Sequence, residues 1–254
     1  LDGEKYTSFE DKNCVRLGGD RVLTTPEYAA YLKIAEGCDN RCTYCAIPSI
    51  RGRFRSRKIE DILEEAKWLA DNGVTEIVVI AQDTTRYGED LYGEPKLAQL
   101  LRELCKIDGL KWIRTLYAYP ERITDELICA IKEEEKLVKY LDIPLQHCNG
   151  EVLKRMNRHG DKETLAKLVN KLRREIPGIT LRTTLIAGFP GETDKEFKGM
   201  LRFIDEYKFD NLGVFAFSLE EGNANYNPSL DKDRFTYSEL MGKEFIWYPN
   251  DVVY

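Results

Sequence analysis

Three cysteines in one short segment constrain this chain more than any other feature: Cys38, Cys42 and Cys45, spaced C-x3-C-x2-C. Thiolates are the usual protein ligands of iron–sulfur clusters, and a cubane 4Fe-4S cluster has four irons to ligate. Three ligands from one loop leave one iron without a protein ligand. Because open positions on metal centres serve chemistry rather than scaffolding, the spacing predicts a reactive cluster rather than a purely structural one.

A structural zinc site is the main alternative reading of these cysteines. Structural zinc takes four ligands, usually as two separated pairs with short internal spacing. The sequence has no second C-x-x-C pair, and its two histidines, His147 and His159, lie far from the cysteines. The pattern therefore favours a cluster, while a zinc site completed by a distant residue stays open as the alternative.

Composition points to a cytoplasmic protein without a membrane segment. The 254 residues include seven cysteines, an odd number, which argues for a reducing compartment and metal ligands rather than a disulfide scaffold. No apolar run approaches the roughly 20 residues that a membrane span needs. The net charge of −6 makes nucleic acid an unlikely partner and mildly favours a basic protein substrate.

Short apolar runs alternate with amphipathic segments, as in βαβ units around a parallel sheet. Six strands are predicted, at residues 31–35, 76–81, 112–117, 140–143, 180–187 and 211–217. Five helices are predicted between them, the first beginning near residue 59 and stopped at Gly73, and the others at 96–107, from Thr124, at 162–175 and from the capping box of Thr193 and Glu196. A shorter helix is expected at 151–157. The fold class is therefore α/β, an incomplete TIM-like barrel of six βα units, (β/α)6, whose active site lies at the carboxyl ends of the strands.

Three segments follow from this pattern. Residues 1–27 are interpreted as a linker or the remnant of an upstream cluster-binding domain, 28–222 as the core, and 223–254 as an unassigned tail. The chain does not begin with Met, so we expect a fragment of a longer protein.

The segment Glu36-Gly-Cys-Asp-Asn-Arg-Cys-Thr-Tyr-Cys45 closely resembles the cluster loop of the radical S-adenosylmethionine (radical SAM) superfamily. The resemblance implies a barrel of the radical SAM type. It also implies that the open iron chelates the amino and carboxylate groups of S-adenosyl-L-methionine (SAM), and that the reduced cluster cleaves SAM to a 5′-deoxyadenosyl radical. An external electron donor is then required.

Within that superfamily, residues 28–222 resemble the radical methylthiotransferases, most strongly through the cluster loop, Ile50-Arg-Gly52 and Gly188-Phe-Pro-Gly-Glu-Thr193. The phrases Gln82-Asp-Thr-Thr85 and Pro144-Leu-Gln-His147 look like the branch that adds a methylthio group to the β-carbon of an aspartate of ribosomal protein S-twelve. The resemblance also implies a second 4Fe-4S cluster on an upstream domain that is missing here. The alternatives are a tRNA adenosine methylthiotransferase and a non-catalytic binding module stabilised by a metal.

Seven further residues are predicted to touch the cofactor, each with a plainer alternative. By resemblance, Tyr44 lies near the adenine, or else only shields the cluster. Polar groups of the loop after residue 81 face the SAM amino group, or else cap a turn; its candidates are Gln82 and Asp83. His147 is a candidate proton carrier at a strand end, or else an ordinary packed or solvent-facing side chain. Arg182 and Thr184 lie on one strand face, where the arginine could hold the SAM carboxylate. By resemblance, Gly188 lies beside the adenine and ribose, or else only forms a tight turn.

Overall fold

The structure is a computed structural model that describes residues 17–19 and 21–218. Most of the predicted core lies within these ranges. The predicted tail at 223–254 and most of the predicted linker at 1–27 lie outside the described residues.

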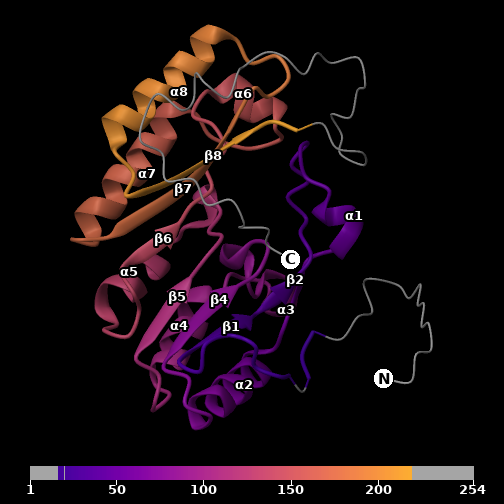
Figure 1. The fold of residues 1–254 in the computed structure, drawn as a ribbon, viewed down its shortest axis with the longest axis vertical. Helices are drawn as coiled ribbons and strands as arrows, with labels where there is room; N and C mark the ends of the chain where they lie inside the picture. The colour runs from indigo at the N-terminus through magenta and orange to yellow at the C-terminus, as the bar shows by residue number, and fades with distance from the viewer. Residues whose placement is uncertain (1–16, 20, 219–254) are drawn as a thin grey trace.

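Six parallel strands form a curved row in chain order (Figure 1). One sheet has the order β1-β4-β5 and the other β6-β7-β8, and all of these pairings are parallel. A parallel bridge between Ile113 and Leu137 links the two sheets. Within the described residues no pairing joins β8 back to β1, so the barrel stays open. The predicted incomplete (β/α)6 barrel is confirmed. The strands are β1 Ala29–Lys33, β4 Glu76–Ile80, β5 Trp112–Thr115, β6 Tyr140–Asp142, β7 Thr180–Ala187 and β8 Asn211–Ala216.

Five longer helices connect these strands and cover one side of the row (Figure 1). They are α2 Ile59–Asp71, α4 Leu97–Cys105, α5 Asp125–Glu133, α7 Lys162–Glu175 and α8 Asp194–Tyr207. The shorter elements are α1 Ile47–Arg51, α3 Glu89–Tyr92, α6 Gly150–Arg155 and the 3-10 turns η1 Thr84–Arg86 and η2 Pro120–Arg122. None of the helices in the described part of the chain is long and apolar enough to cross a membrane.

Capping signals in the sequence set several of the helix ends. The Thr124 hydroxyl accepts from the Leu127 amide at the start of α5, and Thr193 with Glu196 forms the predicted capping box of α8. Gly73, with φ of 90°, ends the turn after α2 as predicted. The helix predicted at 96–107 is slightly shorter, because Lys96 is its N-cap and α4 runs from Leu97 to Cys105.

Alternating burial along the strands separates the core from the barrel interior. On β7, Leu181, Thr183 and Leu185 are fully buried. The intervening Arg182 and Thr184 are only partly buried. Successive strand residues point to opposite faces, so the first set packs beneath the helices and the second faces the open interior. The predicted pairing of Arg182 and Thr184 on one face is confirmed.

Two short strands that the sequence did not predict frame the cysteines. β2, Ala35–Glu36, pairs antiparallel with β3, Arg55–Ser56. The first predicted strand therefore divides into β1 and β2 rather than running unbroken from 31 to 35. Gly37, with φ of 79°, follows β2, and a Cβ there would lie 2.1 Å from the Arg53 carbonyl oxygen. Only glycine fits this close approach, which brings both ends of the cysteine loop together.

Truncating a core residue of β4 should test this two-faced arrangement. Ile77 is completely buried on the helix-facing side, so Ile77→Ala should lower the free energy of unfolding by about 2–5 kcal/mol in urea denaturation. Val78→Ala is the matched control on the same strand, because Val78 is half-buried on the interior side and should cost clearly less. A larger loss from Val78→Ala would mean that the two faces are assigned the wrong way round.

Candidate metal centre

The cysteine loop leaves β2 at the carboxyl end of the strands and returns through α1 to β3. Its ends are joined where the Cys38 amide donates to the Gly52 carbonyl oxygen at 3.3 Å. The Cys45 amide donates to the Cys42 carbonyl oxygen at 3.0 Å, closing a turn between the last two cysteines. All three cysteines are free and half-buried. The predicted ligands therefore lie together on one turn-rich loop at the edge where barrels carry their active sites.

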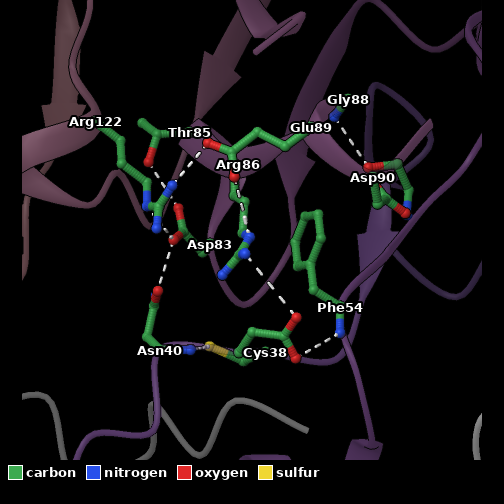
Figure 2. A network of polar contacts seen from close by, with 12 residues as sticks. Cys38, Asn40, Phe54, Asp83, Thr85, Arg86, Gly88, Glu89, Asp90 and Arg122 are labelled. Atoms are coloured by element: carbon green, nitrogen blue, oxygen red, sulfur yellow. Dashed lines mark hydrogen bonds and ion pairs between the residues drawn. The ribbon is translucent and has the colours of Figure 1, made fainter. Parts of the chain in front are cut away.

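The loop after β4 holds one side of the cysteine loop through Asp83 (Figure 2). The Asp83 carboxylate is 1% exposed; it accepts from Asn40 Nδ2 at 2.8 Å and from the Thr85 hydroxyl at 2.6 Å. Arg122 Nε lies 3.6 Å from the same carboxylate. The backbone amide of Asn40 donates to Cys38 Sγ, 3.5 Å away. Asp83 thus anchors the cysteine loop, and in this arrangement its carboxylate is not open to the predicted SAM amino group.

A second set of charges continues outward from this anchor. Asp39, next to Cys38, accepts from Arg53 Nε at 2.8 Å and from the Phe54 amide at 3.3 Å. Glu89 forms ion pairs with Arg122 Nη1 at 2.7 Å and with Arg86 Nε at 3.2 Å. The contacts of Asp39 tie the loop to the residues just before β3, and Arg86, after β4, lies 3.9 Å from the same carboxylate.

The other side of the cysteine loop rests on residues 155–158, at the end of α6. The Thr43 amide donates to the Met156 carbonyl oxygen at 3.1 Å, and the Thr43 hydroxyl to that of Arg155 at 2.9 Å. Asn157 Nδ2 reaches the carbonyl oxygens of Asn40 and Arg41 at 3.2 and 2.9 Å, the latter 116 residues away in sequence. The loop is therefore held between two segments distant in the chain.

Two of the three thiols are weaker acids than an exposed cysteine. Burial raises the pKa of the Cys38 thiol to about 11, and the hydrogen bond from the Asn40 amide offsets this only in part. Burial also raises the pKa of Cys45. Because metal ligands must be thiolates, metal binding at this loop would release protons.

Within the described ranges, no three histidine, cysteine, aspartate or glutamate side chains converge as the ligands of one metal ion do. A cubane cluster differs, because each cysteine binds a different iron and the sulfurs stay farther apart. The donor set of three thiols on one loop fits a cluster with an open iron.

Gln82 offers an unpaired acceptor close to this loop. Its Nε2 donates to Glu36 Oε1 at 3.1 Å, which fixes the orientation of the amide. Its Oε1 is buried and has no hydrogen-bond partner among the described residues. Glu36 also pairs with Lys33 at 2.9 Å. A buried oxygen without a donor is costly, so this site suits a ligand that brings an N–H group.

His147 is fully buried and spans two loops. Its Nδ1 accepts from the Asn149 amide at 2.9 Å, so Nε2 carries the proton and faces Glu192 Oε1 at 3.1 Å. The other Glu192 oxygen accepts from the amides of Gly188 and Phe189 at 2.5 and 3.2 Å. Both ring nitrogens of His147 are engaged, which leaves no open position for the predicted proton transfer in this conformation. The pair instead shapes the loop after β7.

Arg182 and Thr184 share the interior-facing side of β7. Arg182 Nη1 donates to Asp142 Oδ1 at 2.9 Å, and Thr184 follows it on the same face of β7. Burial raises the pKa of Asp142, and the Arg182 charge opposes that rise. Tyr44 packs partly buried against the core, and Gly188 ends β7 with φ of 78°. Their contacts with SAM remain predictions.

Four residues of this site escaped the sequence analysis: Asn40, Asn157, Arg158 and Glu192. Asn157 has φ of 54°, and asparagine at a helix end was the one local signal available for it. Glu192 sits in a segment that reads as a plain turn before the capping box. No local pattern distinguishes Arg158, whose partners come from three distant segments.

The sequence of this chain matches one protein family and several curated relatives. The family model described as the radical SAM superfamily matches residues 32–204. A curated protein named ribosomal protein uS12 methylthiotransferase RimO, from Clostridium tetani, is 56% identical over 220 residues, covering 87% of this chain and 50% of that protein. Its namesake from Alkaliphilus oremlandii is 58% identical over 202 residues, covering 80% of this chain and 46% of the relative. The chain spans about half the length of these relatives.

Solved structures are similar in fold. The radical SAM methyltransferase TsrM from Kitasatospora setae, with cobalamin and a 4Fe-4S cluster bound, matches 78% of this chain with a TM-score of 0.64 and 18% identity, over 38% of its own length. Coproporphyrinogen III oxidase HemN from Escherichia coli matches 76% of this chain with a TM-score of 0.55 and 21% identity, over 44% of its length. At these identities the likeness extends to the fold alone.

The buried pair of His147 and Glu192 makes a prediction about stability. Glu192→Gln places an amide nitrogen where the carboxylate accepts three hydrogen bonds, so it should lower the free energy of unfolding by about 1–3 kcal/mol in urea denaturation. Glu206→Gln is the matched control: it makes the same chemical change at a half-exposed ion pair with Lys162 and should have little effect. Equal effects of the two substitutions would contradict a buried structural role for Glu192.

Proposed function

Because the chain belongs to the radical SAM superfamily, we propose that it is the catalytic core of a methylthiotransferase that modifies an aspartate of ribosomal protein uS12. The observation that carries this proposal is the cysteine loop, three thiols held between two anchors at the carboxyl edge of an open barrel. The similarity to proteins named uS12 methylthiotransferases supports the choice of substrate.

In this proposal Cys38, Cys42 and Cys45 hold one 4Fe-4S cluster, and one iron stays open for SAM. When bound, the cluster and SAM supply a carbon-centred radical that removes hydrogen from an unactivated carbon. The chain's own task is then to bind SAM, exclude water and fix the distance to the substrate, since such a radical reacts with whatever it meets.

The residues around the open barrel suit that task in different ways. The orphaned Oε1 of Gln82 can accept from the SAM ammonium, and Arg182 can pair with the SAM carboxylate beside Asp142. Thr184, Tyr44 and Gly188 are proposed to contact the rest of the cofactor. We propose that Asp83 and His147 support the site indirectly, because their polar atoms already hold the two loops that form it.

The methylthio group needs a sulfur source that this sequence does not supply. The resemblance implies a second 4Fe-4S cluster, yet only three of the seven cysteines have cluster spacing. We therefore place the second cluster on a segment outside these 254 residues. An external electron donor and a cytoplasmic location belong to the same proposal.

The alternatives are a tRNA adenosine methylthiotransferase on the same barrel and a binding module that uses its metal only for stability. A metal-stabilised module would bind its metal without cleaving SAM. A tRNA enzyme would place the methylthio group on an adenosine, so product analysis separates it from the proposed reaction.

Removal of single cysteines should test the cluster. After anaerobic reconstitution with iron, sulfide and zinc available, the chain should hold about four irons, as one cubane cluster requires. Cys38→Ala, Cys42→Ala and Cys45→Ala should each lose most of this iron, because two thiolates hold a cubane poorly. Cys105→Ala, on α4 away from the loop, is the control and should keep it. Stoichiometric zinc without iron would overturn the cluster.

Product analysis should separate the core reaction from sulfur transfer. The reduced, reconstituted chain should cleave SAM to 5′-deoxyadenosine, since the first cluster and the barrel are present. It should not methylthiolate uS12 in mass spectrometry, even with sulfide added, because it lacks the second cluster. A methylthio mass gain on the uS12 aspartate would show that the second cluster is dispensable, and a gain on a tRNA adenosine would move the chain to the alternative branch.

A further inference from the structure

Arg158 is a buried guanidinium at the side of the cysteine loop that rests on the end of α6. The residue is 8% exposed. Its Nη2 donates to the Pro144 carbonyl oxygen at 2.8 Å, and its guanidinium carbon lies 4.1 Å from the centre of the Tyr119 ring. Its Nη1 points at Cys42 Sγ, 3.9 Å away. The side chain therefore ties together the segment after β6, the segment after β5 and the middle cluster cysteine.

These contacts do not neutralise the charge. Arginine stays protonated in proteins, and a buried charge is costly unless an opposite charge accompanies it. Among the described residues no carboxylate lies within ion-pair distance of Arg158. The Tyr119 ring and the Pro144 carbonyl offer only partial negative charge. The one contacting atom that can carry a full negative charge is Cys42 Sγ, which becomes a thiolate when it binds iron.

The other arginines near the loop differ in this respect. Arg53 pairs with Asp39 at 2.8 Å and its side chain is 72% exposed. Arg86 and Arg122 share Glu89. Arg41, directly before Cys42 in the sequence, is exposed to solvent. Arg158 alone of these is both buried and without a carboxylate within ion-pair distance in the described part of the chain, so its charge acts on Cys42 through a medium that screens it least.

We propose that Arg158 is a positioning residue that serves as the counter-charge of Cys42 and sets the reduction potential of the cluster. This inference rests on the proposed function, since it requires a cluster on the cysteine loop. One-electron reduction by the external donor adds a negative charge to the cluster. A buried positive charge beside one ligand stabilises the reduced form more than the oxidised form and raises the potential.

The test is the midpoint potential of the reconstituted cluster, measured by a redox titration followed by electron paramagnetic resonance (EPR). In Arg158→Gln the ratio of reduced to oxidised cluster at a fixed potential should fall at least tenfold, a lowering of about 59 mV for one electron. Arg158→Lys keeps the charge and should stay close to the unsubstituted chain. Arg41→Gln removes the same charge next to Cys42 but from solvent, and it too should stay close.

The outcomes separate charge from packing. An unchanged potential in Arg158→Gln, or an equal fall in Arg158→Lys or Arg41→Gln, would overturn the inference. If Arg158→Gln fails to hold its iron while Arg158→Lys and Arg41→Gln retain it, the charge is needed to keep the cluster, which supports the assignment. Loss of iron from Arg158→Lys as well would assign the role to the shape of arginine and contradict it. A parent chain that forms no cluster would refute the proposed function along with it, whereas a cluster with an unmoved potential would remove only this inference.

Discussion

The site depends on one constraint: a loop with three cysteines must hold its shape before any metal arrives. Loops at the ends of barrel strands have little secondary structure of their own, so their geometry comes from contacts with distant segments. Here Asp83 holds the first half of the loop through Asn40, and Asn157 holds the second half through two backbone carbonyls. Gly37 makes the narrow entry possible. Removing any of these would loosen the ligands without touching a sulfur.

The barrel gives these anchors their fixed positions. Its strands bury alternate residues beneath the helices, and that packing sets where each strand ends. Asp83 follows β4 and His147 follows β6, so each polar group arrives at the same edge from a different strand. The pair of His147 and Glu192 then shapes the loop after β7 in the same manner. Rigid strands and buried polar contacts together fix the edge of the barrel at which we propose that SAM binds.

Sequence reasoning succeeded where the physical signal is local. Alternating apolar residues predicted the six parallel strands. Thr124 and Thr193 predicted the starts of α5 and α8, because an N-cap bonds to residues a few positions along the chain. The C-x3-C-x2-C spacing revealed the ligand loop for the same reason. It failed for β2 and β3 and for Arg158, because a two-residue strand has no period and a buried arginine looks like a solvated one until its partners are known. Asp83 and Gln82 were found as a pair, but only the structure distinguishes the anchored carboxylate from the amide with a free oxygen.

The proposed function requires that the cluster keep one iron open for SAM. The most direct measurement is electron–nuclear double resonance on the reduced, reconstituted chain with SAM labelled by ¹⁵N at its amino group. An open iron that binds SAM predicts a hyperfine coupling between that nitrogen and the cluster, together with a changed EPR signal on addition of SAM. An EPR signal that SAM leaves unaltered, with no nitrogen coupling, would contradict it.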